Sequence, residues 1–278
     1  MSVPTQNIAV SLTGLTGDFG DRLSVIKAAG FDRIELDAAE LSKQGDLRLA
    51  ESLLLESGLK LSAYKEFKDF TGHKGHVIRY KMQLAQANLK MMAALGCNLL
   101  VVTPSARNRT DSDDEIIAQL RALSTLAMLR GIKVGYRPLP WSDHAYDYES
   151  AYRLVEQAGN ANLGLVVDSF HNLTDLNIDE LFTQVPGDKV FLIRLSDFAM
   201  STLYTLEDKI EVDHHQRLFP GEGGHSSDLT TLLRNCQTAG YQGDLVLSAN
   251  DDRYRFSSLE TVIAKASQSR DWVLSKLN

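Results

Sequence analysis

The sequence has few of the features that mark secreted, membrane-spanning or nucleic-acid-binding proteins. Cys97 and Cys236 are the only cysteines among 278 residues, so two buried thiols are expected rather than a disulfide framework. No apolar stretch approaches the roughly 18 to 20 residues that a membrane-spanning helix needs. Dense basic runs are also missing, and the formal net charge is -7. Neither a membrane nor a nucleic acid is therefore expected as a partner, because phosphate binding needs clustered cations.

No targeting signal is expected from the first residues of the sequence. Met1 to Ile8 lack the basic region and apolar block of a signal peptide, so a cytoplasmic location is predicted. With 44% apolar and 23% charged residues, the composition is that of a globular protein with a large core. The length suits one domain, which we predict over residues 1–278.

The sequence is rich in one repeating unit. Eight short apolar runs each end in polar or charged residues, and a helix-like stretch follows most of them. The runs are Ile8–Ser11, Arg33–Leu36, Leu59–Ala63, Asn98–Thr103, Ile132–Tyr136, Leu163–Val167, Val190–Leu195 and Leu245–Ser248. Such runs predict parallel strands buried on both faces. Eight units predict a (β/α)8 TIM barrel, in which the active site lies at the C-terminal ends of the strands.

The stretches between these runs have helical periodicity. Apolar residues recur at three- and four-residue spacing, which predicts an outer ring of helices. These stretches are Arg22–Ala29, Leu47–Glu56, Val77–Leu95, Glu115–Leu129, Tyr148–Gln157, Leu229–Thr238 and Leu259–Leu274. About fifty residues separate Leu195 from Leu245, which predicts a long loop after strand 7 that acts as a lid or substrate loop.

Two arginines end otherwise apolar strands. Arg137 and Arg194 cannot lose their charge and need anionic or carbonyl partners. One interpretation is that they form salt bridges with Asp168 or Glu222 that close the barrel mouth. The other, which we favour, is a clamp for the anionic group of a small metabolite.

Asp168 and His171 follow the sixth strand with three-residue spacing. Together they can orient a substrate, move a proton or bind a metal, and an imidazole at a partly open mouth is expected to titrate near neutrality. A purely structural histidine is the alternative. Lys65 is placed to reach inward from strand 3, and His144 to wall the pocket after strand 5. His214 and His215 are a minor candidate for metal ligands.

Three strings resemble a known family. They are Gly164–His171, Pro186–Val190 leading to Leu195–Asp197, and Arg217–Gly223. They resemble the xylose-isomerase-like sugar phosphate isomerase/epimerase superfamily, and within it the 3-dehydroshikimate dehydratases of the TIM-barrel type. The resemblance implies a divalent metal at the mouth. The positions matching its ligands are Arg137, Asp168, Arg194 and Asn250, and only the aspartate is kept. Arginine has no electron pair to donate to a metal, so we expect neither a metal nor another cofactor.

The resemblance also implies substrate contacts. His171 matches a histidine that contacts substrate and shuttles a proton, Arg217 an arginine near the ligand, and Lys68 an expected basic residue, while Glu222 occupies a glycine-flanked turn. One aspartate with two arginines would make the site net positive. The sequence thus predicts a metal-independent lyase or isomerase/epimerase that transfers protons on a small anionic polar metabolite, such as a keto acid, sugar acid or sugar phosphate. The alternative is a catalytically dead metabolite-binding protein. A homodimer is left open.

The predicted site falls into two groups by role. The catalytic residues are His171, Asp168, Arg137 and Arg194. The substrate-binding residues are Asn250, Arg217, Glu222, Lys65, Lys68, Glu35, Tyr64 and His144.

Overall fold

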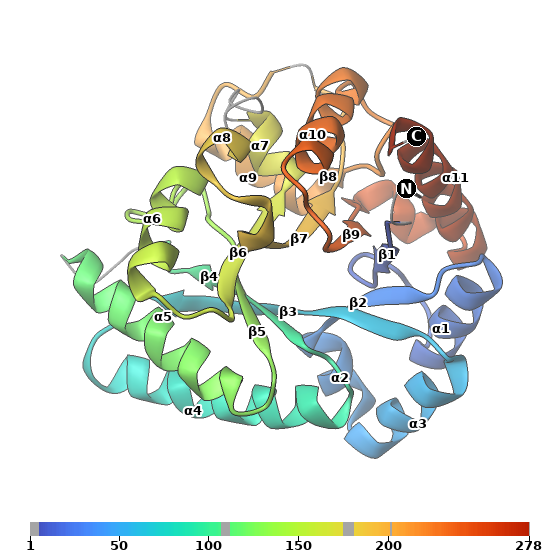
Figure 1. The fold of residues 1–278 in the computed structure, drawn as a ribbon. Helices are drawn as coiled ribbons and strands as arrows, with labels where there is room; N and C mark the ends of the chain where they lie inside the picture. Colours follow the sequence, from blue (N-terminus) through green and yellow to red (C-terminus); the bar gives the residue numbers. More distant parts are fainter. Residues whose placement is uncertain (1–5, 107–111, 175–180, 201, 278) are drawn as a thin grey trace.

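The computed structural model describes residues 6–106, 112–174, 181–200 and 202–277 (Figure 1). Within these residues, eight parallel strands close into a barrel in the order β1-β2-β3-β4-β5-β6-β7-β9, which confirms the predicted fold class. The barrel strands are β1 (Ile8–Ser11), β2 (Arg33–Asp37), β3 (Lys60–Thr71), β4 (Leu99–Pro104), β5 (Lys133–Tyr136), β6 (Leu163–Asp168), β7 (Val190–Leu195) and β9 (Asp244–Leu247).

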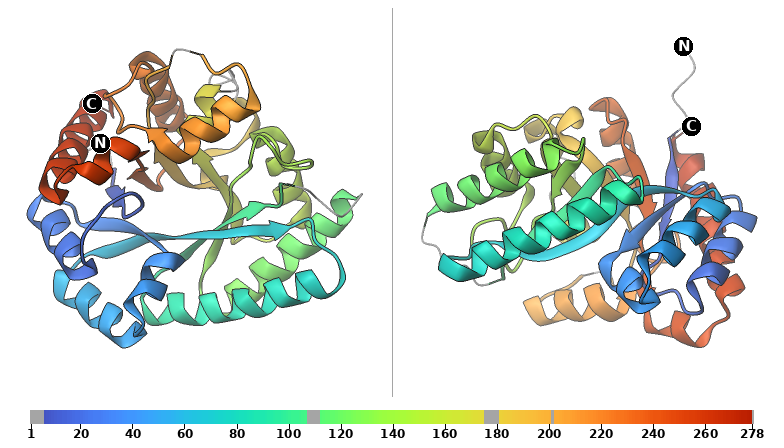
Figure 2. Two further views of the ribbon diagram at one scale, coloured as in Figure 1. Left: turned by 180° about the vertical axis from the view of Figure 1, so that it is seen from behind. Right: turned by 90° about the horizontal axis from the view of Figure 1, so that it is seen from below.

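Helices surround the barrel in the views of Figure 2. They are α1 (Phe19–Ala28), α2 (Ala38–Gln44), α3 (Leu47–Ser57), α4 (Gly75–Ala94), α5 (Asp113–Met128), α6 (Tyr148–Ala158), α7 (Ser169–Thr174), α8 (Leu181–Gln184), η1 (Gly187–Lys189), α9 (Leu206–His215), α10 (Ser226–Thr238), η2 (Asp252–Phe256) and α11 (Leu259–Leu277). The predicted helix ring is therefore confirmed. Gly58 ends α3 with a left-handed φ of 65°, a conformation that glycine adopts without the steric cost of a Cβ atom.

The long connection that the sequence predicted after β7 has more secondary structure than expected. It contains α9 and the short strand β8 (Gln216–Arg217), which pairs antiparallel with β10 (Asn250–Asp251). Thr205 caps α9 by accepting a hydrogen bond from the backbone of Asp208, an arrangement that stabilises a helix start. The periodicity argument missed α9 because the helix buries only Val212 and has no apolar stripe.

Side chains alternate between the inside and the outside of the barrel. The residues that fill the inside form a small apolar layer, and they are Ala9, Ala63, Leu99, Val101, Val166, Leu192 and Val246. The intervening residues pack outward against the helices. Because alternate strand residues share a face, the residues two positions beyond Ala63, Val166 and Leu192 also point inward. These are Lys65, Asp168 and Arg194, and they open a polar layer above the apolar one.

At the opposite end of the barrel, Asp244 joins the last strand to the first three. Its carboxylate accepts hydrogen bonds from Ser62 Oγ at 2.7 Å, from Asn7 Nδ2 at 3.0 Å and from Arg33 Nη1 at 3.1 Å. This cluster, which we call the Asp244 seam, closes the ring between β9 and the start of the chain.

Two expectations from composition can be compared with the structure. Cys97 and Cys236 are both free and buried, as predicted. In the described part of the chain, no helix combines the length and apolar character needed to cross a membrane.

Candidate functional site

Arg137 lies at the centre of the polar layer, directly after β5. Its Nε donates to Glu66 Oε1 at 2.8 Å, and its Nη1 donates to Asp168 Oδ2 at 3.2 Å and to His171 Nε2 at 2.8 Å. Burial would lower the pKa of Arg137, but the charges of Glu66 and Asp168 outweigh burial and raise it. The guanidinium is therefore a fixed positive charge with neighbours on three sides.

Arg194, near the end of β7, is held by two carboxylates. Its Nε donates to Glu35 Oε1 at 2.7 Å and its Nη1 to Glu66 Oε1 at 3.1 Å. Glu66 thus contacts both guanidinium groups. Burial would raise the pKa of Glu66, but the charges of Arg137 and Arg194 hold it well below the usual range. Glu66 is an internal anion at the position where the sequence predicted a bound one.

Where the sequence predicted a clamp for an external anion, the structure places the carboxylate of Glu66 between the two guanidiniums. The alternative that we did not favour, arginines closed by salt bridges, is the arrangement that the structure shows. Asp168 is one partner, as proposed, but Glu222 is not. The Glu222 carboxylate instead pairs with Lys265 and accepts a hydrogen bond from Phe219 N at 3.3 Å.

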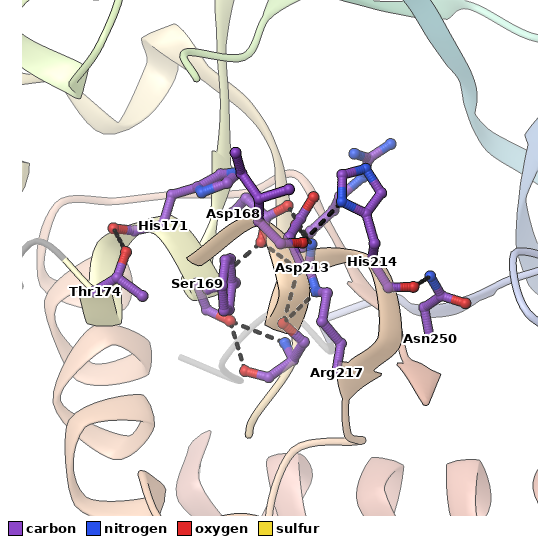
Figure 3. A network of polar contacts seen from close by, with 12 residues as sticks. Asp168, Ser169, His171, Thr174, Asp213, His214, Arg217 and Asn250 are labelled. Atoms are coloured by element: carbon purple, nitrogen blue, oxygen red, sulfur yellow. Dashed lines mark hydrogen bonds and ion pairs between the residues drawn. The ribbon is translucent and has the colours of Figure 1, made fainter. Parts of the chain in front are cut away.

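Arg217, brought in by β8, contacts a third group of residues. Its Nη1 donates to Asp168 Oδ2 at 3.2 Å and to Asp213 Oδ1 at 2.9 Å, and its Nη2 donates to Ser196 Oγ at 2.7 Å. Figure 3 shows Asp168, Asp213 and Arg217 converging. Burial would raise the pKa of Asp168, but Arg217 and Arg137 hold it far below its usual range. Asp168 is consequently ionised at neutral pH.

The charges of this network balance. Among the described residues, four carboxylates face four cations: Glu35, Glu66, Asp168 and Asp213 against Lys65, Arg137, Arg194 and Arg217. The sequence argument counted one aspartate and two arginines and predicted a net positive site. That prediction is wrong because Glu35 was not counted as a partner and because Glu66 and Asp213 were missed altogether.

The two missed acids had weak sequence signals. Glu66 follows Lys65 directly, so strict alternation would turn its side chain away from the barrel interior. The register of β3 against β4 shifts between Tyr64 and Phe67, and such irregularities redirect side chains. Asp213 lies on α9, the helix without an apolar stripe. A search for acidic residues near the strand ends would have found Glu66.

His171 is buried and neutral. A guanidinium can only donate, so His171 Nε2 accepts from Arg137 and the ring proton lies on Nδ1. This Nδ1 is buried and has no hydrogen-bond partner among the described residues. Burial lowers the pKa of His171 to about 4, with Arg137 adding to this effect and Asp168 opposing it. Burial thus moves the pKa of His171 away from the neutral range that the sequence predicted, because the side chain lies inside the network.

Lys65, within β3, is less enclosed than the arginines. Its Nζ lies 3.9 Å from Glu35 Oε2, and 13% of its side chain is exposed, compared with 2% for Arg194. Burial, with the charge of Arg194 adding to it and the charges of Glu35 and Glu66 opposing it, lowers the pKa of Lys65 to about 8.

Five predicted residues lie outside this network. Tyr64 packs in the outer core and lines a cavity with Leu41 and Met91, because it neighbours the inward-pointing Lys65 and alternation turns it outward. Lys68 is exposed. His144 Nδ1 lies 2.7 Å from Asp113 Oδ1 at the start of α5.

The other two are Glu222 and Asn250. Glu222 lines a separate cavity of about 330 Å³ with Arg253 and Tyr254. Asn250 donates to the His214 carbonyl at the edge of the network (Figure 3). The structure brings together Glu35, Lys65, Arg137, Asp168, His171, Arg194 and Arg217 from the predicted set.

The residues at the expected metal position do not fit a metal. Arg137 and Arg194 offer no lone pairs, and both oxygens of Asp168 accept from arginines. In the described ranges, no group of three His, Cys, Asp or Glu side chains is arranged to hold a metal ion. His214 and His215 belong to no such group within the described ranges; His214 Nδ1 contacts the Ile210 carbonyl at 2.8 Å and His215 Nδ1 contacts Asp252 at 3.2 Å.

Comparison with known proteins agrees with the fold and the resemblance. Residues 23–275 match a family model described as a xylose isomerase-like TIM barrel. A 3-dehydroshikimate dehydratase from Pseudomonas aeruginosa is 30% identical over 249 residues, which cover 89% of this chain and 38% of that protein. The chain therefore spans well under half of that relative's length.

Two further relatives complete the comparison. An inosose isomerase from Bacillus subtilis is 25% identical over 218 residues, covering 75% of this chain and 72% of that protein. A solved xylose isomerase-like TIM barrel/4-hydroxyphenylpyruvate dioxygenase fusion protein superimposes with a TM-score of 0.89 at 27% identity, covering 98% of this chain and 43% of that chain.

Proposed function

Because the chain belongs to the xylose isomerase-like TIM barrel family, whose relatives here include a dehydratase and an isomerase, we propose that it is a metal-independent lyase or isomerase. It transfers protons on a small hydroxylated carbonyl compound. The observation that carries this proposal is Arg137. Its guanidinium is fixed between Glu66 and Asp168 and donates to His171, so it supplies positive charge without an ion.

The ligand class follows from the charge balance and from the relatives. The network is neutral, so its charge no longer singles out anions over other polar ligands. The names of both curated relatives contain a hydroxylated ketone, a dehydroshikimate and an inosose. We therefore extend the predicted keto acids, sugar acids and sugar phosphates to neutral hydroxylated ketones.

The roles of individual residues change accordingly. The neutral His171 has an unpartnered Nδ1–H, which donates a hydrogen bond to a ligand oxygen, as neutral imidazoles do in other proton-transfer enzymes. Arg137 and Arg194 stabilise negative charge that develops on that oxygen. Asp168 holds Arg137 and Arg217 in place. Lys65, with a pKa of about 8, is the member of the network suited to exchange a proton near neutral pH.

Hydrogen exchange at the carbon beside the carbonyl tests this proposal. The protein is incubated in D2O with 3-dehydroshikimate, an inosose, keto acids and sugar phosphates, with and without EDTA, and exchange is followed by NMR. We expect at least one ketone to exchange, EDTA to have no effect, and His171→Gln to slow exchange by roughly 10²–10³-fold, the usual cost of one lost oxyanion donor. Exchange that disappears with EDTA and returns with added Mn²⁺ would refute the metal-independent mechanism.

One observation favours a second function, metabolite binding without catalysis. Glu66 already fills the space between Arg137 and Arg194, and Asp168 and His171 are enclosed by ion pairs and hydrogen bonds. A chain that had lost catalysis would keep such a stable, closed network. This function is indicated if a ketone raises the melting temperature, no ketone exchanges hydrogen, and His171→Gln leaves the melting shift unchanged.

A further inference from the structure

Lys65 differs from the other three cations of the network. Arg137, Arg194 and Arg217 each contact at least two carboxylates. Within the described part of the chain, Lys65 Nζ has a single ionic contact, with Glu35 at 3.9 Å, and donates no hydrogen bond. Its side chain is also the most exposed of the four. Because the amine of Lys65 makes only this one long ionic contact within the described part of the chain, it can turn to a ligand without breaking a hydrogen bond.

The surroundings of Lys65 are those of a reactive amine. Four charged groups from different strands act on it: Glu35 of β2, Glu66 of β3, Arg194 of β7 and Arg217 of β8. Burial and the neighbouring Arg194 lower its pKa to about 8, so an appreciable fraction is unprotonated near neutral pH. Lysines activated in this way, by burial or by a neighbouring cation, are the ones that form Schiff bases with carbonyl substrates.

We infer that Lys65 is a catalytic nucleophile that forms a Schiff base with the carbonyl carbon of the bound ketone. The inference rests on the proposed function, since it requires a carbonyl ligand at the mouth. It assigns to this residue a covalent step that simple proton exchange would not need.

The step balances in atoms and charge. The neutral amine attacks the carbonyl carbon, the C–N bond forms, and the π electrons move to oxygen, which takes up protons and leaves as water. Counted from the ammonium form, one ammonium and one carbonyl give one protonated imine and one water. The positive charge of Lys65 is therefore preserved, so the four-against-four balance of the network survives the reaction.

The neighbouring acids suit the product. Glu35 Oε2 is buried, lies nearest to Lys65 Nζ and accepts no hydrogen bond from the described residues. It can accept one from the N–H of the protonated imine. The imine withdraws electrons from the adjacent carbon, so a proton passes from that carbon to water more readily than it does from the free ketone. A fixed lysine thus acidifies the C–H bond without a Lewis-acidic ion.

Reductive trapping tests the inference. The protein is incubated separately with 3-dehydroshikimate and with an inosose, then treated with sodium borohydride, which reduces an imine to a stable secondary amine. We expect an intact-mass gain equal to the probe less one oxygen atom, and peptide mapping that places the adduct on Lys65. Lys65→Met should abolish it. Lys60→Met, an exposed lysine at the other end of the same strand, is the matched control and should retain it.

A thermal-shift measurement with the same probes distinguishes a failure of this inference from a failure of the proposed function. A probe that raises the melting temperature but leaves no adduct on Lys65 overturns the inference while the binding part of the proposed function stands. An adduct found only on other lysines overturns it equally. If neither probe binds or reacts, the proposed ketone site and the Schiff base fall together. Mapping on the unmodified sequence decides the question even if Lys65→Met does not fold.

Discussion

Replacing Glu66 by Gln removes the internal anion that Arg137 and Arg194 share. Removing one partner of a buried ion pair commonly costs about 3–5 kcal/mol, because a buried charge is left without its partner. The glutamine keeps one acceptor oxygen, Arg137 keeps Asp168, and Arg194 keeps Glu35. We therefore expect the free energy of unfolding to fall by about 3 kcal/mol, the low end of that range. This loss lowers the melting temperature by roughly 6–12 °C for a domain of this size.

Urea unfolding and thermal unfolding measure this loss, with Glu211→Gln as control. Glu211 is an exposed glutamate on α9, and its substitution should change the free energy of unfolding by no more than about 0.5 kcal/mol. If Glu66→Gln is as stable as this control, Glu66 is not a partner on which the two arginines depend.

The same variant should restore the anion site that the sequence predicted. With Glu66 uncharged, inorganic phosphate can contact both guanidiniums, and saturation to about 100 times Kd would recover about 2.7 kcal/mol. The unmodified protein should show little phosphate-dependent stabilisation, because the negative charge of Glu66 repels phosphate and already balances the two guanidiniums. Equal phosphate shifts in both proteins would contradict the idea of an internal anion.

Three further predictions concern metal, pH and packing. Elemental analysis should find no stoichiometric Mn, Zn, Co or Mg, and EDTA should leave the melting temperature unchanged, because arginines stand where ligands would be needed. The pKa of His171 is about 4 when folded, against about 6.5 when unfolded, so the unfolded chain takes up the proton first as pH falls. The stability that this difference contributes is fully present above about pH 6.5 and is lost as the pH falls to about 4, by about 2 kcal/mol at pH 5. Urea unfolding of His171→Gln across this range should lack that loss. If the free energy of unfolding of the variant falls with pH as steeply as that of the unmodified protein, His171 is not the group responsible. Gly135→Ala would place a Cβ 2.5 Å from Val166 Cγ2 inside the barrel. Denaturant unfolding should therefore show a free energy of unfolding lower by about 1–3 kcal/mol. An unchanged free energy would mean that the inner apolar layer adjusts freely.

The fold could be predicted from the sequence because barrel strands leave a local signature. Each run such as Leu163–Val167 is apolar on both faces and ends in a polar residue, and the helices between runs carry their own period. The strand ends also indicated which residues meet, and Arg137, Asp168 and Arg194 do lie together. These conclusions needed only the order of elements and the position of residues along them.

The partners within the site could not be predicted in the same way. Which carboxylate meets which guanidinium depends on where β3 shifts its register and on a helix, α9, that has no apolar stripe. Tyr64 and Lys65 are adjacent in sequence, yet alternation sends one to the outer core and the other to the mouth. The sequence argument treated both as mouth residues. In a regular strand this cannot hold, because the side chains of neighbouring residues point to opposite faces.

The Asp244 seam has a consequence for the order in which the chain folds. Its hydrogen bonds join residues 182 and 237 positions apart, among the longest sequence separations that the barrel contains. Closing such long loops is slow compared with forming local helices and adjacent strand pairs. During synthesis, β1 to β7 can assemble while the ring is still open, but Ser62, Arg33 and Asn7 gain their shared acceptor only after residue 244 leaves the ribosome. Until then, the edges of β1 and β7 lack their neighbour, and the nascent chain presents unpaired strand edges that chaperones can bind or that can aggregate.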